Sequence, residues 1–394
     1  MIRFLLIAAA LSLGATAAGA QGNLSAQGFG YPPGQLSTRA LAMGGGFAEF
    51  DPQSAINPQA VGSWGPAGLY FQYDPEFRRV SVGPQSARTT TARFPVLAAA
   101  VPLGTRFAIG VAASTFLDRS WATQSTGSDT VFGTPVDVTE RVRSVGAIND
   151  VRLAGSFAVA PSLRLGVAVH ALTGENRLQL RNDFTPVPGA DTTTVFQAAT
   201  ESRTVGYSGA ALSAGAEWRP SRAIAVAASA RRGGDLRADA GDTLIATARV
   251  PNRYGVGVRY EGLRGATLAA RVNWEGWSSL ADLTPRDGLP VSDTFEYGVG
   301  ADVAGPRIGA STVSVRLGVR LRDLPFGLRA EPTRSLPEAR DVRELAFSGG
   351  LGIPLASNRA MVDLALQHAS RSASSRSDVD ERAWTLSLGL RVRP

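Results

Sequence analysis

The chain has two histidines, His170 and His368, and they limit the catalytic chemistry that it could perform. A Ser-His-Asp hydrolase needs a histidine that bridges a serine and an orienting carboxylate. A structural or catalytic zinc site needs three or four nitrogen, sulfur or oxygen ligands around one ion, and the sequence has no cysteine. It also lacks a G-x-S-x-G elbow and an H-E-x-x-H motif. The sequence therefore predicts no enzymatic activity, no metal site and no cofactor.

The residues around each histidine alternate in polarity, with a period of two that indicates β-strands. In the stretch 163–170, His170 falls in step with an arginine, a glycine and an alanine, while leucine and valine occupy the other parity. In the stretch 362–368, His368 falls in step with valine and leucine. We expect His170 to be a hydrogen-bonded residue of a polar interior and His368 to point outward. Histidines on opposite faces cannot share a metal ion.

The stretch 384–393 shows the same alternation most clearly, with Trp, Leu and Val on one parity and Thr, Ser, Gly and Arg on the other. Strands of about ten residues with one apolar face and one polar or glycine-rich face are typical of transmembrane β-barrels. Comparable segments recur about fourteen times along the chain. The sequence therefore predicts an all-β fold, a transmembrane antiparallel β-barrel of about 14 strands. The expected strands are 66–80, 89–102, 105–119, 138–160, 162–178, 203–219, 222–232, 247–262, 266–277, 294–304, 312–323, 342–354, 359–370 and 380–393.

Tight turns are expected at one end of these strands, and longer polar loops, such as 120–137 and 179–202, at the other. Outer-membrane barrels show this contrast, with the short turns on the periplasmic side. A charged side chain facing lipid at the middle of a bilayer costs about 2–4 kcal/mol, so the arginines and carboxylates should line the interior. The alternative is a soluble β-sandwich or propeller. A soluble sheet protein of this size would need a second apolar face to pack against, and these strands have only one.

The first residues predict export. Residues 1–20 have a positive start, a short apolar run and a small-residue cleavage site, as in a signal peptide. No later run is long and apolar enough for a membrane-spanning helix. The net charge of +7 comes from single arginines spread along strands, so we expect no nucleic acid partner. Anionic lipid headgroups and a solvated interior suit this charge better.

Residues 21–64 differ from the rest because they are rich in Gly and Pro and do not alternate. Ser37 is a suitable cap for a short helix that ends at the glycines 44–46, and Asn57-Pro58 is expected to end a second turn. We interpret this segment as a hatch inside the barrel formed by 65–394. The alternative is a disordered periplasmic tail. The glycine run lacks a following Gly-Lys-Ser/Thr, so it predicts close packing against the wall and not a phosphate site.

Two prolines fall inside expected strands. Pro95 and Pro251 each remove a backbone donor from the ladder, so the wall should bulge or part at these positions. Such a kink could be a route from the interior to the bilayer, or a harmless bulge near the rim.

The stretch 37–60, with its S-x-R-A start, Gly-rich run, acidic residue and Asn-Pro element, resembles the N-terminal hatch of the FadL/OmpP1/TodX family of outer-membrane proteins. It is also similar to the start of the PorV-like branch. The resemblance implies a hatch that plugs a barrel and the uptake of hydrophobic compounds, with lateral release through the wall. Asn57 and Pro58 match the family's Asn-Pro element near that opening in the wall. Met43, Phe47 and Phe50 are apolar hatch residues that could contact the ligand's tail, and Arg39 could pair with a carboxylate. The alternative is that these residues only anchor the plug.

The predicted function is therefore passive, hatch-gated uptake of long-chain fatty acids or aromatic hydrocarbons through the cell outer membrane of a Gram-negative-type bacterium. Its expected partners are outer-membrane lipid, a hydrophobic small-molecule ligand and the barrel-assembly machinery. The alternatives are a PorV-like barrel that binds exported proteins and a general polar porin.

Overall fold

The computed structural model describes residues 25–26, 28–188, 196–284, 289–308, 311–327, 342–355, 359–373 and 376–393. The predicted signal peptide, residues 1–20, lies outside these ranges, as do residues 21–24 and 27 of the predicted hatch. Within the described ranges, no helix is both long enough and apolar enough to cross a membrane.

Strands make up most of the described chain, and short helices occur only in the N-terminal segment and in one connection. The helices are α2 (Thr38–Ala42), η1 (Pro58–Ser63) and η2 (Trp277–Leu283). The strands are β1 (Gly68–Val82), β2 (Gln85–Arg93), β3 (Val96–Leu103), β4 (Phe107–Asp118), β5 (Trp121–Val131), β6 (Thr134–Ala160), β7 (Leu163–Pro186), β8 (Ala199–Trp218), β9 (Ile224–Ala240), β10 (Thr243–Arg249), β11 (Arg253–Leu263), β12 (Ala266–Glu275), β13 (Thr294–Ile308), β14 (Ser311–Leu324), β15 (Val342–Leu355), β16 (Ala360–Ala373) and β17 (Arg376–Val392).

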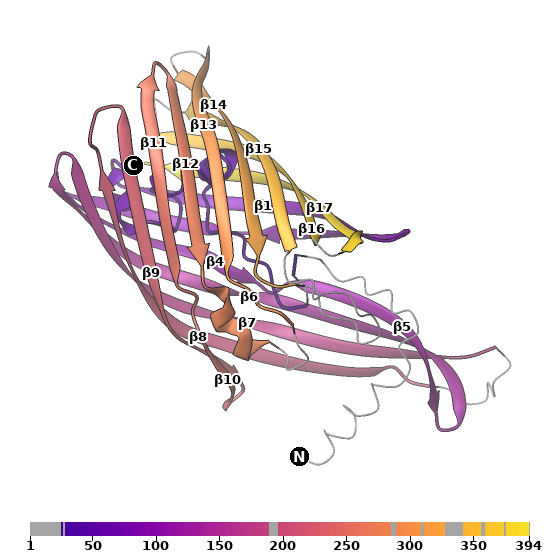
Figure 1. The fold of residues 1–394 in the computed structure, drawn as a ribbon. Helices are drawn as coiled ribbons and strands as arrows, with labels where there is room; N and C mark the ends of the chain where they lie inside the picture. Colours follow the sequence, from indigo (N-terminus) through magenta and orange to yellow (C-terminus); the bar gives the residue numbers. More distant parts are fainter. Residues whose placement is uncertain are drawn as a thin grey trace.

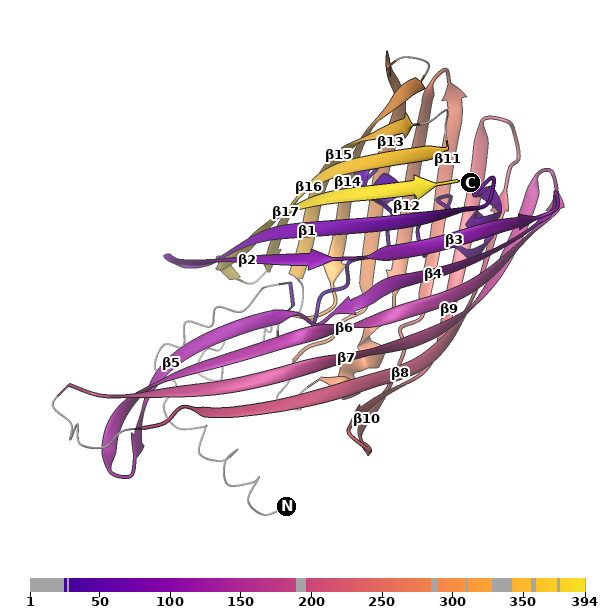
Figure 2. The same cartoon turned by 180° about the vertical axis from the view of Figure 1, so that it is seen from behind.

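These strands form one closed antiparallel sheet (Figures 1 and 2). Each strand pairs with its neighbours along the chain, and the ring closes where β17 pairs with β1, with Leu69 opposite Val392. Three barrel strands are each interrupted, so β2 and β3, β4 and β5, and β10 and β11 are halves of single strands. The seventeen segments are thus a barrel of 14 strands, as the sequence predicts.

Side chains alternate between the outside and the inside of the barrel along each strand. In β7, Val167 is 65% exposed while the neighbouring Ala168 is 5% exposed. In β17, the outward Trp384, Leu386 and Leu388 are exposed and the inward Ser387 is buried. The inward set includes the largest fully buried side chains of the described chain, among them Arg231, Arg253, Arg316, Arg320 and Arg371. The predicted facing of apolar and charged residues is confirmed for these strands.

The two longest expected loops are wrong. Residues 120–137 are mostly β5 and the start of β6, which join in a hairpin at Phe132-Gly133. Residues 179–202 continue β7 to Pro186 and begin β8 at Ala199. Near the tips of these hairpins, around Phe132-Gly133 and Pro186, water can reach both faces, so the strands need no apolar side there. Their sequences then lack the alternation by which the other strands were recognised.

The N-terminal segment, residues 25–64, is buried almost throughout its described length. The Ser37 hydroxyl accepts a hydrogen bond from the Ala40 amide at 3.1 Å, which confirms the predicted cap of α2. Asn57-Pro58 does not end a turn; Asn57 caps η1, whose first residue is Pro58. Gly44 has φ +60°, and a Cβ there would lie 2.5 Å from the backbone of Val319 in β14. Glycine therefore lets this segment approach the wall closely, as expected.

Candidate functional site

A cavity of about 740 Å³ lies between the N-terminal segment and the ends of β5 to β10. Its lining combines apolar and aromatic side chains with polar ones, among them Arg119, Arg203 and Asp282, and it lies beside the largest cluster of buried apolar residues in the described chain. This cavity falls in the size range of protein sites for small organic ligands. The lining includes Phe29, Trp121, Val205, Tyr207, Ala246 and Leu283.

Phe29, a lining residue, belongs to a group of aromatic rings packed beside this cavity. The ring of Phe29 lies 4.7 Å from that of Phe326, and Phe116 stacks on Trp277 at 5.2 Å. The Arg119 guanidinium lies 4.2 Å from the centre of the Phe29 ring and donates a hydrogen bond to the Tyr207 hydroxyl at 2.7 Å. Cation-π contact of this kind holds a charged group against an apolar surface. Sequence reasoning missed these residues because they come from segments far apart in the chain; an aromatic residue at the very end of an expected strand, as at Trp277, was the available signal.

The wall of the barrel parts between β2 and β5. On the side of the break toward the short turns, β3 pairs with β4 from Val96 to Leu103. On the other side of the break, β2 pairs with β1 and β5 pairs with β6, but no ladder joins β2 to β5 among the described strands. Figure 2 shows the two strands diverging. We call this opening the seam.

A second cavity, of about 400 Å³, fills the seam. Inward-facing residues of the wall line one side of it, among them Val80, Thr89 and Val142. Outward-facing residues, among them Arg88 and Arg141, line the other side. The seam cavity therefore passes from the inner to the outer face of the sheet. It shares Thr123, Gln124 and Val142 with the larger cavity, so the two cavities adjoin.

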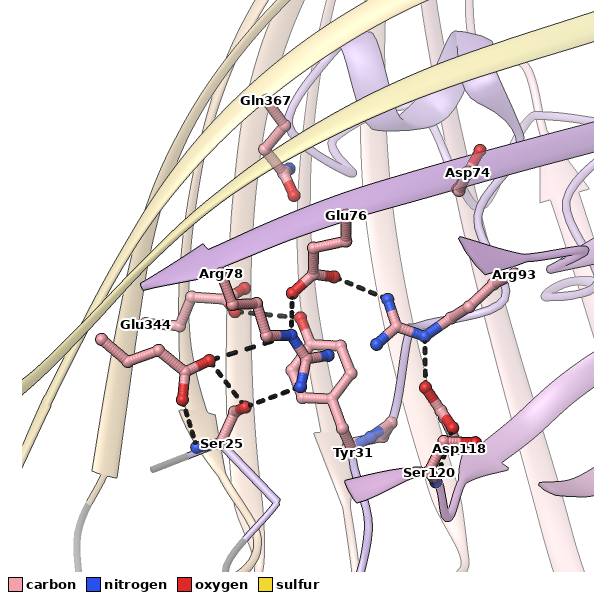
Figure 3. Close-up of polar contacts among 12 residues, drawn as sticks. Ser25, Tyr31, Asp74, Glu76, Arg78, Arg93, Asp118, Ser120, Glu344 and Gln367 are labelled. Atoms are coloured by element: carbon pink, nitrogen blue, oxygen red, sulfur yellow. Dashed lines mark hydrogen bonds and ion pairs between the residues drawn. The ribbon is translucent and has the colours of Figure 1, made fainter. Parts of the chain in front are cut away.

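The N-terminal segment is tethered beside the seam. Tyr31 and Asp118 exchange backbone hydrogen bonds of 2.8 and 2.9 Å at the point where β4 ends. From the wall, Arg93 donates to the carboxylates of Asp118 and Glu76, the latter at 2.6 Å (Figure 3). Charge-assisted bonds of this kind fix both the segment and the two broken strands.

Tyr31 also lies at the centre of a buried ionic network (Figure 3). Its hydroxyl donates to Glu344 at 3.0 Å and accepts from Arg371 at 2.8 Å. The Glu344 carboxylate accepts from Arg322 at 2.7 Å and from Arg371 at 2.6 Å. Burial raises the pKa of the Tyr31 phenol above its ordinary value, so the hydroxyl stays protonated and able to donate.

The hatch residues implicated by the family resemblance lie away from the lining of both cavities. Met43, Phe47 and Phe50 are buried together against alanines of β9 and β12. Arg39 forms an ion pair with Asp302 at 3.0 Å and lies over the Phe47 ring at 4.2 Å.

Asn57 and Pro58, the remaining pair, belong to the start of η1. The Asn57 amide donates to Glu49 at 3.0 Å and to the backbone carbonyl of Ala228 at 3.2 Å. These contacts hold the segment to the wall. A role in ligand contact stays a prediction for all six hatch residues.

Pro95 lies in the break between β2 and β3, and Pro251 lies in the break between β10 and β11. The first break coincides with the seam. At the second, Arg231 donates to the Pro251 carbonyl at 3.3 Å, and Arg253 donates to the Ile56 carbonyl of the N-terminal segment at 2.6 Å. Arginines from β9 and β11 thus fill the space inside this break.

His170 is a hydrogen-bonded interior residue, as predicted. Its Nδ1 lies 2.9 Å from Asp150 and its Nε2 lies 2.8 Å from the Ser213 hydroxyl, so the three side chains form a Ser-His-Asp chain across β6, β7 and β8. Ser213 is only 6% exposed and lies in the middle of a paired strand, where backbone N–H groups serve the ladder and form no oxyanion hole. Neither His170 nor Ser213 lines the two cavities.

His368 is outward-facing, also as predicted, with its ring 4.5 Å from that of Trp384 on the neighbouring strand. The two histidines therefore lie on opposite faces of the wall.

The chain was compared with known proteins. No protein-family profile matches the sequence, and no curated protein matches it. Solved structures do match. The chain is similar to a FadL homologue of Pseudomonas aeruginosa, with a TM-score of 0.58 and 14% identity over 92% of this chain and 99% of that one.

Two further structures match over comparable lengths. The toluene transporter TbuX of Ralstonia pickettii gives a TM-score of 0.57 with 16% identity, over 91% of this chain and 98% of that one. The toluene transporter TodX of Pseudomonas putida gives 0.56 with 15% identity, over 90% and 97%. At such identities the likeness concerns the fold. The chain thus has the barrel fold of FadL-like and TodX-like proteins, in agreement with the resemblance that its sequence shows.

Proposed function

We propose that this protein is an outer-membrane channel for the passive uptake of hydrophobic compounds. The observation that carries the proposal is the pair of adjoining cavities, one apolar and beside the N-terminal segment, the other crossing the wall at the seam. A hydrophobic ligand gains free energy when it leaves water for the apolar cavity and again when it leaves sideways into lipid. The band of exposed apolar side chains around the outside of the barrel fits a position in a bilayer.

The N-terminal segment is the hatch in this proposal. Its contacts reach inward-facing side chains on widely separated strands, such as Ser114 on β4 and Arg271 on β12. A segment held in this way inside the lumen blocks the passage of water and ions. Phe29 belongs to the hatch and also lines the apolar cavity, and the Tyr31 tether lies next to the seam. Ligand that displaces Phe29 would therefore act on the tether two residues away.

The apolar cavity suits aromatic hydrocarbons, and two arginines on its lining, Arg119 and Arg203, suit a carboxylate as well. TbuX and TodX, whose structures are similar, are toluene transporters, which supports aromatic hydrocarbons as the ligand class. The partners in this function are the ligand and the surrounding lipid. We assign no hydrolytic activity, because Ser213 has neither access to these cavities nor an oxyanion hole.

The test is uptake of radiolabelled toluene and of oleate by cells that carry the gene or an empty vector. We expect faster uptake of at least one compound with the protein. The variant Ala246→Trp, which fills the cavity, should return uptake to the vector level, with heat-modifiable migration on a gel as the check of folding. Arg203→Gln should slow oleate only. Equal uptake by cells with and without the protein would refute the channel.

A further inference from the structure

The outer mouth of the seam is lined by four arginines, and no carboxylate side chain belongs to the described lining of this cavity. Arg88 comes from β2, Arg141 and Arg143 from β6, and Arg181 from β7. Two of them, Arg141 and Arg181, share one carboxylate, that of Asp183, which lies 2.8 Å from Arg181. Arg88 and Arg143 form no ion pair with any residue that the structure describes. The mouth therefore carries a local excess of positive charge.

The register of the strands places these arginines close to one another and to further arginines. Arg141 is directly opposite Arg181 across β6 and β7. On the other side of the seam, Arg79 of β1 is directly opposite both Arg88 of β2 and Arg382 of β17. Like charges in directly opposite positions repel one another unless an anion lies between them. Asp183 partly offsets the first of these rows and Asp380 pairs with Arg382 at 3.5 Å, so Arg79 and Arg88 are opposed arginines that form no ion pair with a described residue.

Apolar side chains border these rows on the side of the wall that we place in the bilayer. Along β1 the exposed Phe77 precedes Arg79 by two residues, and on β6 the exposed Val145 follows Arg143 by two. Residues two apart on a strand point the same way. The arginines thus form a cationic edge at the boundary of the outward apolar surface, where lipid headgroups would lie.

We infer that the outer mouth of the seam, lined by Arg88, Arg141, Arg143 and Arg181, is a binding site for the phosphate-bearing headgroup of an outer-leaflet lipid. Guanidinium groups bind phosphate oxygens in bidentate pairs, and several together hold a multiply charged headgroup. The adjoining apolar edge receives the acyl chains, which a free phosphate or a soluble anion would leave unused. Bound lipid would stand at the lateral exit and close it until a ligand displaces the headgroup.

This inference rests on the proposed position of the barrel in an outer membrane, and its test separates the two. The purified full-length protein is reconstituted into phosphatidylcholine vesicles that contain fluorescent lipid A or the same lipid after its phosphates have been removed. Energy transfer from tryptophan reports lipid at the wall. The test variant changes all four seam arginines to glutamine. The control variant has the same change of charge at four exposed arginines of the short-turn end, Arg106, Arg222, Arg264 and Arg307.

We expect the seam variant to weaken binding of phosphorylated lipid A by at least about tenfold, since each arginine near an anionic lipid surface adds to the attraction. The control variant and the dephosphorylated lipid should show no such difference. The doubly substituted R88Q/R143Q is the fallback if the quadruple variant does not fold, and it should show part of the loss.

Three outcomes would overturn the assignment. Equal losses in the seam and control variants would mean that overall charge, and not this site, attracts the lipid. If the seam variant takes up oleate more slowly but binds lipid A normally, the arginines belong to the carboxylate of the transported ligand. Failure of the unchanged protein to enter the vesicles would remove both this inference and the proposed function.

Discussion

At the scale of single residues, the interior is held by buried arginines whose partners lie on neighbouring strands and on the N-terminal segment. Glu344 is the clearest case, because it accepts hydrogen bonds from Arg320, Arg322 and Arg371 and from Tyr31, and it is itself completely buried. Removing one partner of a buried ionic network leaves the other charges without compensation, whereas removing an exposed pair has little effect.

Glu344→Gln should therefore lower the free energy of unfolding by about 3–5 kcal/mol, because three guanidinium groups lose their shared charge. The matched control is Glu261→Gln, which removes the half-exposed partner of Arg259 at 3.5 Å. It should cost less than about 1 kcal/mol. Urea unfolding in lipid vesicles, followed by tryptophan fluorescence, measures both values. Equal losses in the two variants would contradict the role given to the network.

Val142 lies where the two cavities adjoin, so it tests the route at the residue scale. In Val142→Trp the larger ring should fill the neck and reduce ligand uptake to near background, while ligand binding in the apolar cavity persists. Val145→Trp is the control, because Val145 lies on the same strand but points outward and is 49% exposed. Uptake is measured with labelled ligand and binding with equilibrium dialysis. Normal uptake through Val142→Trp would mean that ligand leaves by another path.

At the scale of elements, the seam exists because two adjacent barrel strands break close together, with β4 running from its last partner position, Ser114, on to Asp118. The second strand breaks at Phe94-Pro95 and the third at Arg119-Ser120. Proline cannot donate to a ladder, which explains the first break. At the second break, the Asp118 amide and carbonyl pair with Tyr31 of the N-terminal segment. The facing edges of β2 and β5 therefore have no neighbouring strand with which to pair.

Closing the seam should stop lateral release. The chain has no cysteine, so a Thr89→Cys/Thr123→Cys pair on the two sides of the seam cavity can be joined cleanly by a bismaleimide. We expect uptake to fall on cross-linking and to stay normal in each single variant treated in the same way. Val226→Cys/Val258→Cys is the control, because these residues are already opposite each other in paired strands. A cross-linked seam with unchanged uptake would place the exit elsewhere.

At the scale of the whole molecule, the N-terminal segment and the barrel form a single packed unit. Polar contacts run from the segment to β1, β4, β6, β9, β12, β13, β14, β15, β16 and β17. The position of the N-terminal segment is set by many strands together, because no single strand supplies more than a few of its contacts.

Deleting residues 25–60 should open a steady ion conductance in planar bilayers, because the lumen would then be filled with water. A milder test uses two glycines with left-handed φ. In Gly44→Ala the new Cβ would lie 2.5 Å from the β14 backbone, whereas at Gly104 it would meet nothing within 4 Å. Both variants strain the backbone, but only Gly44→Ala should displace the segment and raise the leak. Closed channels after the deletion would show that the segment does not plug the barrel.

The sequence by itself determined the class of fold, the approximate number of strands and the facing of residues in the alternating strands, because successive side chains of a strand point to opposite faces. It also predicted that His170 lies in the polar interior and that the glycines at 44–46 pack closely. It did not predict the long hairpins at 120–137 and 179–202, where water on both faces removes the alternating pattern.

The tertiary structure alone decided where the cavities lie. Phe29, Phe116, Trp277 and Phe326 come together, and two strand breaks lie side by side, only because the sheet curves into a ring and the N-terminal segment packs against it. Partners for His170, and the crowding of four arginines at one opening, likewise depend on register between strands. Periodicity along a chain specifies which way a side chain points, but neighbours from distant segments become known only when the backbone has closed.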